Sequence, residues 1–202
     1  MYPNVNYYPF VKHKKEILEQ YCQKGFEAAH VEWLDDEIVG IIDKNIDIRI
    51  SNIKHTSKAS FTKFHGLFAE FSLNKNINAD IRILLADAMM PESNYIENRE
   101  HLKKVVMDNS NFEKEFNVYT DNKYVANQIL TSTVLEQLTS YYKNFGMTFE
   151  LTLQNNEAAL RIDTGAMFES LTKENLFVYY SILNFTFNLV KKIYNIVENT
   201  DI

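Results

Sequence analysis

The sequence has few of the residues that make covalent links or unusual backbone geometry. Among its 202 residues there are one cysteine, five glycines and three prolines. A lone thiol, Cys22, forms no intramolecular disulfide and no cysteine-based zinc site. This cysteine content is typical of a protein from the cell interior. The glycines stand far apart, and none precedes the Lys-Ser pair or helix start of a phosphate cradle. This excludes nucleotide binding by a standard loop.

Positive charge is also scarce. The chain has 21 basic and 27 acidic residues, and its formal net charge is -6. Duplex binding needs clustered Lys and Arg that displace counterions from phosphates, so we expect no nucleic-acid partner. Lysine far outnumbers arginine, and Asn, Ile, Phe and Tyr are frequent. A/T-rich codons produce this pattern, which indicates a low-GC bacterial genome.

No segment is typical of a signal peptide or a membrane span. Met1 to Pro9 lacks a basic start and an apolar run, which predicts a cytoplasmic protein. Leu176 to Val197 is the one candidate span, but polar residues recur in it at spacings of 3 and 4, namely Ser181, Asn184, Asn188, Lys191 and Asn195. This spacing predicts a helix packed against a sheet or other helices, with one polar edge in water.

Alternation of apolar and polar residues predicts an antiparallel sheet. The predicted strands cover Glu37–Ile42, Ile46–Ile50, Leu67–Leu73, Ile81–Leu85, Phe149–Leu153 and Ala158–Asp163. Val105–Met107 is a candidate for a further strand, and Val118–Tyr119 is expected to run extended. Asp43–Asn45 and Asn155-Asn156 are the turns of two hairpins. The first four strands follow one another closely, which predicts a meander. Gly66 is placed for a bulge or a close backbone approach.

The predicted helices cover Phe10–Lys24, Asn122–Leu130, Ser132–Asn144 and a C-terminal segment from near Thr172, before a frayed tail at Glu198–Ile202. Gly25 and Gly146 are expected C-terminal caps, Asp121 an N-cap, and Met89–Leu102 an exposed loop. The fold class is therefore α+β: a single domain with a mostly antiparallel sheet of about six or seven strands, packed with N-terminal, central and C-terminal helices on one side. We expect this domain, residues 1–202, to consist of a helical segment (1–30), an α+β core (31–169) and a helix with a tail (170–202).

The sequence contains no catalytic or metal-binding motif. The five histidines have no ligand spacing, and no Gly-x-Ser-x-Gly elbow is present, so we assign no metal, no cofactor and no catalytic residue. Cys22 falls on the apolar stripe of the first predicted helix, which is typical of a buried, inert thiol. Acidic residues cluster at Asp35-Asp36-Glu37 and at Glu113 with Glu115, where strand edges favour solvated carboxylates over an acid–base pair.

Four short features have both a structural and a functional interpretation. Trp33 and the Tyr7-Tyr8 pair suit a ligand groove or a partner surface, and they also suit the core. The Lys103-Lys104 and Lys191-Lys192 doublets suit contact with anionic lipid, and they also suit a solvated face. We favour the structural interpretation for each.

The run from Val105 to Leu138 contains a recognisable pattern, carried by Phe112, Glu113, Phe116, Val118, Tyr119, Asp121, Ala126, Leu130 and Thr131. It resembles a family of bacterial proteins known as domain of unknown function 3137. Ser132 stands where the family has Pro, a change that the first turn of a helix tolerates. Asp36–Gly40 and Phe64–Phe68 resemble two further strands of the family, so the resemblance spans Trp33 to Glu169. It implies no activity, because the family has none assigned. Relatives carry hydrophobic segments ahead of this domain, which implies membrane association through an upstream segment absent from this chain.

We therefore expect a non-catalytic binding or interaction module of a bacterial cytoplasm, working at the inner face of the membrane with a protein partner. The alternative is an enzyme whose site is assembled from residues distant in the sequence, with Asp36, Glu70, His65 and Arg161 as candidate members. A structural homo-oligomer is the third hypothesis, and it predicts a large apolar patch outside the core.

Overall fold

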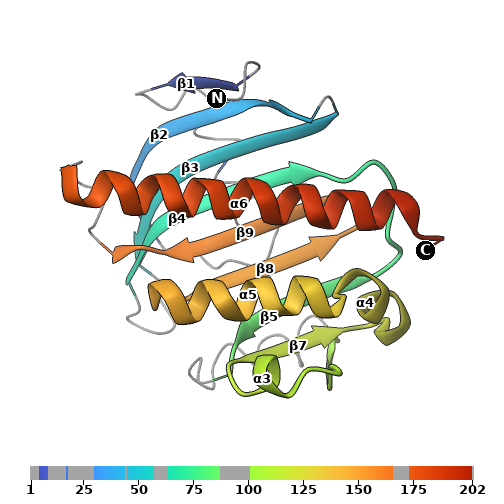
Figure 1. Ribbon diagram of the computed structural model, residues 1–202. Helices are drawn as coiled ribbons and strands as arrows, with labels where there is room; N and C mark the ends of the chain where they lie inside the picture. Colours follow the sequence, from blue (N-terminus) through green and yellow to red (C-terminus); the bar gives the residue numbers. More distant parts are fainter. Residues whose placement is uncertain are drawn as a thin grey trace.

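The structure is a computed structural model that describes residues 5–8, 17, 30–43, 45–56, 63–86, 101–165 and 173–201. In these residues, nine strands form one antiparallel sheet in the order β1-β2-β3-β4-β9-β8-β5-β7-β6 (Figure 1). The strands are β1 Val5–Tyr8, β2 His30–Ile42, β3 Ile46–Thr56, β4 Lys63–Ser72, β5 Asp80–Leu85, β6 Lys103–Val105, β7 Phe116–Thr120, β8 Phe149–Gln154 and β9 Glu157–Asp163. The described helices are α3 Ser110–Glu113, α4 Lys123–Ile129, α5 Ser132–Phe145 and α6 Lys173–Asn199.

The α+β architecture is confirmed, but the predicted count of six or seven strands is wrong, because the described sheet has nine. Its two edges are short. β1 has four residues and β6 has three, with both lysines of β6 exposed. Edge strands add little to the core and are commonly short or charged, so neither shows the alternation by which inner strands are recognised.

The strand order also differs from the predicted meander. β2, β3 and β4 follow it, but the β8–β9 hairpin lies between β4 and β5. The carbonyl oxygens of Asn156 and Asn155, in the turn of this hairpin, accept hydrogen bonds from the N–H groups of Leu73 and Ile77, at 2.7 and 2.9 Å. The connection from β4 to β5 therefore crosses the turn of the hairpin. The alternation within a single strand does not specify such a long-range contact.

The helices α5 and α6 lie next to each other across one face of the sheet (Figure 1). Apolar side chains of that face, among them Ile50, Leu160 and Ile83, share one core with the two helices. Tyr141 of α5 and Phe185 of α6 stack with their ring centroids 3.9 Å apart, which joins the helices to each other. Burying one large apolar side chain in such a core stabilises the fold by roughly 1.5–3 kcal/mol.

The helix ends follow the predictions in part. α5 closes on Gly146, whose φ of 64° is the left-handed cap expected there. The N-cap of α4 is Asn122, whose side chain accepts a hydrogen bond from the Val125 N–H, so the assignment of Asp121 was wrong. Asp121 accepts a hydrogen bond from the Asp80 N–H at 2.9 Å instead, because it lies beside the start of β5.

The C-terminal tail is anchored, although a frayed tail was predicted from Glu198 onward. α6 extends to Asn199, and the Lys75 ammonium donates a hydrogen bond to the Thr200 carbonyl oxygen at 2.6 Å. Earlier in α6, Lys191 pairs with Asp43 at 2.8 Å. The last third of the helix is therefore attached to two connections of the sheet.

Two predicted segments lie almost wholly outside the described residues. These are the helix at Phe10–Lys24, with its Gly25 cap, and the loop at Met89–Leu102. Of the first, only Ile17 is described, and it is helical and buried. Of the second, only His101 and Leu102 are described.

Gly66 and Gly146 predict a sharp difference between two identical substitutions. A methyl group at Gly66 would overlap the carbonyl oxygen of Ile162, because β4 and β9 approach closely there. Gly146 has open space around it, and alanine there meets only the strain of a positive φ. We expect Gly66→Ala to lower the free energy of unfolding by about 3 kcal/mol or more, and Gly146→Ala by about 1 kcal/mol. Urea denaturation measures both, and equal losses would contradict the close approach.

Candidate functional site

The face of the sheet opposite α5 and α6 carries a set of ionic side chains. Residues alternate between the two faces along each strand, so every second residue points away from the helices. Three of the four arginines of the chain lie there, on β3, β5 and β9. We call this surface the charged face and define it by Glu37, Arg49, Glu70, Arg82, Glu150 and Arg161.

Arg49 lies between two glutamates at one end of the charged face. Its Nε is 3.4 Å from Glu37 Oε1, and its Nη1 is 4.0 Å from Glu70 Oε2. The Glu37 side chain is fully buried, so the guanidinium compensates a carboxylate that water does not reach. A groove of about 320 Å³ lies beside these residues, and Asp47 and Glu157 also line it. The balance of charge in the groove is negative.

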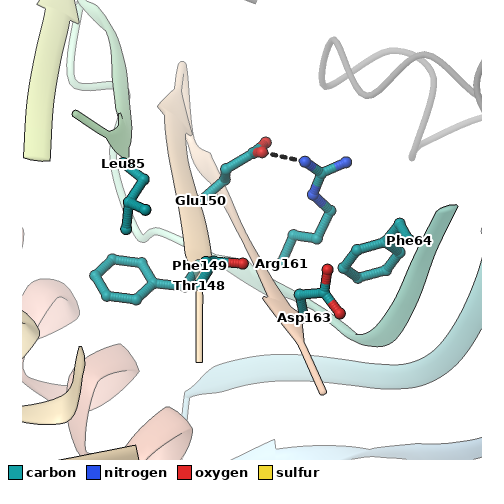
Figure 2. Close-up of a pocket in the computed structure, with 7 residues that line it drawn as sticks. All are labelled: Phe64, Leu85, Thr148, Phe149, Glu150, Arg161 and Asp163. Atoms are coloured by element: carbon teal, nitrogen blue, oxygen red, sulfur yellow. Dashed lines mark hydrogen bonds and ion pairs between the residues drawn. The ribbon is translucent and has the colours of Figure 1, made fainter. Parts of the chain in front are cut away.

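Arg161 lies further along the charged face. Its guanidinium forms an ion pair with Glu150, the residue opposite it on β8, and lies 4.8 Å from the centroid of the Phe64 ring. These side chains and Asp163 line a cavity of about 50 Å³ (Figure 2). A cavity of this size holds a few water molecules and no organic substrate.

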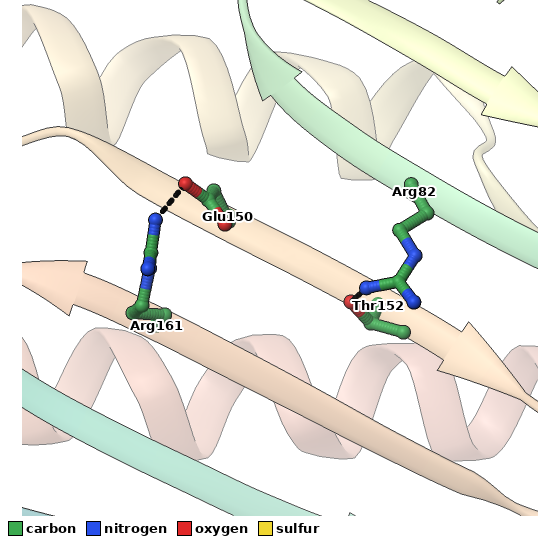
Figure 3. Close-up of polar contacts among 4 residues, drawn as sticks. All are labelled: Arg82, Glu150, Thr152 and Arg161. Carbon is green, nitrogen blue, oxygen red and sulfur yellow. Dashed lines mark hydrogen bonds and ion pairs between the residues drawn. The ribbon is translucent and has the colours of Figure 1, made fainter. Parts of the chain in front are cut away.

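Arg82 is the third arginine of the charged face and is 8% exposed. Its Nη1 donates a hydrogen bond at 3.0 Å to the hydroxyl of Thr152, the residue opposite it on β8 (Figure 3). Each of the three guanidinium groups thus has a polar or anionic partner on another strand. This arrangement favours one register of the sheet, because a slip by one residue would leave buried charges unpaired.

The four residues considered for an enzyme site occupy three places. Glu70 and Arg161 lie on the charged face of adjacent strands, two residue pairs apart. His65 is buried, and the alternation along β4 turns it toward the helix-covered face. Asp36 lies beside β1, where it accepts a hydrogen bond from the Tyr7 hydroxyl at 2.5 Å. Of the four, the structure brings only Glu70 and Arg161 to a common face.

The acidic clusters are less solvated than the sequence suggested. Glu37 is fully buried, because Arg49 on the next strand neutralises it. Glu113 accepts a hydrogen bond from the Met107 N–H at 2.8 Å and so holds the segment between β6 and α3. Glu37 is recognised as the buried partner of Arg49 only when β2 is known to pair with β3. The sequence of the acidic cluster Asp35-Asp36-Glu37 does not show that pairing.

Asp36, Tyr7 and Tyr179 interact near the β1 edge of the sheet. Asp36 has a φ of 53° and stands at an irregularity of β2, between Asp35 and Glu37, where a bulge re-aims a side chain. Burial raises the pKa of Tyr179 to about 12, and the charges of Asp36 and Tyr7 add to the rise. The effect of Asp36 and Tyr7 on Tyr179 indicates that the part of α6 around Tyr179 lies near β1 and β2.

The same part of α6 carries an exposed aromatic surface. Leu176, Phe177 and Tyr180 are 51%, 74% and 69% exposed, and Tyr7 of β1 is 58% exposed. Figure 1 shows the first turns of α6 extending past the ends of the neighbouring strands. Large apolar side chains grouped on a surface in this way mark an interaction site more often than single ones do.

The polar stripe predicted for α6 is confirmed at Asn184, Asn188 and Asn195, which are all exposed. Sequence reasoning missed that Phe177 and Tyr180 continue the same stripe toward the start of the helix. A signal was present, because no residue from Asn175 to Val190 is charged. We call the stripe formed by Phe177, Tyr180, Asn184, Asn188 and Lys191 the outer face of α6.

The remaining candidates have simpler surroundings. The Trp33 side chain lies outside the described part of the structure, and Tyr8 is half-buried. Lys103 and Lys104 are exposed on the edge strand β6, and Lys192 Nζ lies 3.5 Å from the Thr133 carbonyl oxygen. None of the helices in the described part of the chain has the length and hydropathy that a membrane span requires. The same residues contain no group of three His, Cys, Asp or Glu side chains arranged to hold a metal ion.

Comparison with known proteins assigns the family. The sequence profile described as "Protein of unknown function (DUF3137)" matches residues 62–201, more than half of the chain. The chain belongs to this family. The match starts and ends later than the resemblance over Trp33 to Glu169, so it includes α6 and omits β1 to β3. No curated protein matches the sequence.

One solved structure has a similar fold. It is the crystal structure of the mycobacterial trehalose monomycolate transport factor A, TtfA. The TM-score is 0.58 at 8% sequence identity, and the alignment covers 96% of this chain and 86% of that one. At this identity, the likeness shows a common fold.

Substituting Arg49 in this DUF3137 protein should destabilise the fold, because the buried Glu37 carboxylate would lose the charge that Arg49 supplies. Arg49→Met removes the guanidinium beside the fully buried Glu37 carboxylate, and we expect the free energy of unfolding to fall by about 3 kcal/mol. Glu37→Gln with Arg49→Met removes both charges and should restore most of that loss. Urea denaturation of the wild type, both single variants and the double variant measures the coupling. Additive losses would show that the two side chains do not interact.

Tyr179 should make the stability of the protein sensitive to alkaline pH. Its pKa is raised, so the folded protein favours the neutral phenol, and this contribution to stability is present below pH 10 and is lost as the pH rises through about 12. Between pH 10 and 12, we expect the free energy of unfolding of the wild type to fall by up to about 2 kcal/mol more than that of Tyr179→Phe. Urea denaturation at both ends of the interval measures the difference. Tyr124→Phe, at an exposed site, is the control and should behave as wild type does.

Proposed function

We propose that this DUF3137 protein is a non-catalytic binding module of the bacterial cytoplasm that works at the inner face of the membrane. Its binding surface is the outer face of α6 with the adjoining Leu176 and Tyr7. The observation that carries the proposal is the exposure of Phe177 and Tyr180 on a helical segment without charged residues. The centres of protein interfaces are enriched in aromatic residues and depleted of charged ones.

The placement of the charges supports binding over chemistry. Catalytic groups need access to a substrate, whereas Arg49 and Arg161 contact glutamates of their own sheet. The protein has a net charge of -6, yet sixteen consecutive residues of α6, Asn175–Val190, carry none of its charge. A partner meeting this surface removes no charged group of that segment from water, which keeps the cost of association low.

The likeness to TtfA supports the same conclusion at the level of the fold. Its name describes a transport factor and names no reaction. A related fold in this chain supports a role in transport that depends on contacts between molecules. The single domain over residues 1–202 fits this proposal, because the binding helix packs on the central strands of the sheet.

The groove beside Arg49 favours a second candidate function. Its volume of about 320 Å³ suits a small molecule, and Glu70 lines it together with Asp47 and Glu157. An enzyme assembled here would use Glu70 with Arg49, a pair contributed by adjacent strands. Of the residues first considered for an enzyme, only Glu70 lines this groove.

Native mass spectrometry of tagged protein purified from its own host separates the two candidates. We expect wild type to retain a macromolecular or lipid partner, Phe177→Ser/Tyr180→Ser to lose it, and Tyr124→Ser to keep it. Tyr124 is the matched control, because it is as exposed as Tyr180, at 69%, but lies on α4. A small molecule that stays in the double variant and is lost from Glu70→Gln would support the enzyme and count against the module.

A further inference from the structure

We infer that the outer face of α6 binds a second copy of this chain, with the two α6 helices antiparallel about a two-fold axis at Asn184. The inference rests on the proposed function, because it names the occupant of the same surface. Most homo-oligomers are closed by a two-fold axis, and such an interface must be complementary to itself. The outer face meets this requirement in the order of its side chains.

The five positions that define the outer face of α6, four of them exposed and Lys191 half-buried, are arranged symmetrically about Asn184. Tyr180 and Phe177 lie 4 and 7 residues before it, and Asn188 and Lys191 lie 4 and 7 residues after it. Steps of 4 and 7 residues stay on one side of an α-helix, so all five side chains face the same way. A two-fold axis through Asn184 therefore places Tyr180 opposite Asn188 of the second copy, and Phe177 opposite Lys191.

The opposed side chains are chemically complementary. A phenol and an amide exchange hydrogen bonds, and the two Asn184 amides pair as donor and acceptor. An ammonium group over a phenyl ring is attracted by the negative face of the ring. Asp43 holds Lys191 Nζ at 2.8 Å, so this lysine loses little freedom when the ring of Phe177 covers it. No like charges meet between Asn175 and Val190, since that segment has no charge.

The surface is extended enough for a dimer contact. From Phe177 to Lys191 the helix rises by roughly 21 Å at about 1.5 Å per residue. Each of the two copies contributes this length of helix to the contact. The two-fold axis also places the exposed Leu176 and Tyr7 at both ends of the contact. The interface thereby gains a tyrosine ring at each end, and tyrosine is among the residues that most often dominate binding energy.

Cysteine cross-linking tests the position of the axis. Two copies of Asn184→Cys meet at the axis and should form a disulfide-linked dimer under mild oxidation. Asn195→Cys is the matched control, because it is exposed on the same stripe, yet its two copies would lie roughly 33 Å apart. We expect at least tenfold more cross-linked dimer for Asn184→Cys, with wild type as the control for Cys22. Equal yields in the two variants, or none in Asn184→Cys, would overturn the inference.

Light scattering of the unmodified chain provides a second, independent measurement. At 100 μM we expect twice the monomer mass of 23.7 kDa, and we expect Phe177→Ser to raise the dissociation constant about tenfold or more. A monomeric wild type at this concentration rules out the second copy. If the monomer then binds phosphatidylcholine vesicles through Phe177, a bilayer is the occupant, so the inference fails while the proposed function stands. If Phe177→Ser changes neither the mass nor the material retained from the host, both fail.

Discussion

The rest of the structure depends on the pairing of β4 with β9. This pairing joins the first four strands in the sheet to the other five, and it brings together segments that are almost a hundred residues apart. The Thr164 N–H donates a hydrogen bond to the His65 carbonyl oxygen at 3.0 Å beside Gly66, whose lack of a side chain allows the strands to approach. The same register sets Glu70 opposite Ala159. It therefore builds both the continuous core and one wall of the groove beside Arg49.

The molecule separates its charged and uncharged surfaces. On the charged face, arginines and glutamates contact one another across strands, so much of their electrostatic energy stabilises the sheet itself. On the other face, α6 covers the core with one side and presents Phe177, Tyr180 and three amides on the other. The segment Asn175–Val190 of α6 has no charged residue, and Lys191 beyond it is already paired with Asp43. A partner that meets this surface therefore encounters little charge repulsion and a small cost of desolvating ions. Binding through α6 follows from this separation more directly than catalysis does.

Much of the fold could be predicted wherever a local pattern was sufficient. The β8–β9 hairpin, the Gly146 cap and the polar stripe of α6 all depend on residues near one another in the sequence. Gly66 by itself indicated a bulge or a close approach, but the strand that approaches it, at Ile162, lies almost a hundred residues away. The strand order could not be predicted, because it is fixed by backbone bonds between Leu73, Ile77 and a turn about eighty residues later. The burial of Glu37 depends in the same way on Arg49. The predicted polar stripe of α6 began at Ser181, so it did not include Phe177 and Tyr180, which are exposed near the start of the helix.

Hydroxyl-radical footprinting read by mass spectrometry tests the central claim, that the outer face of α6 is the binding surface, most directly. Tyr180 and Tyr124 have the same exposure, 69%, and lie on different helices, α6 and α4. The account predicts equal oxidation of the two rings in dilute solution. As protein concentration rises or host membranes are added, oxidation of Tyr180 and Phe177 should fall several-fold while that of Tyr124 is unchanged. Equal oxidation of Tyr180 and Tyr124 under all of these conditions would contradict it.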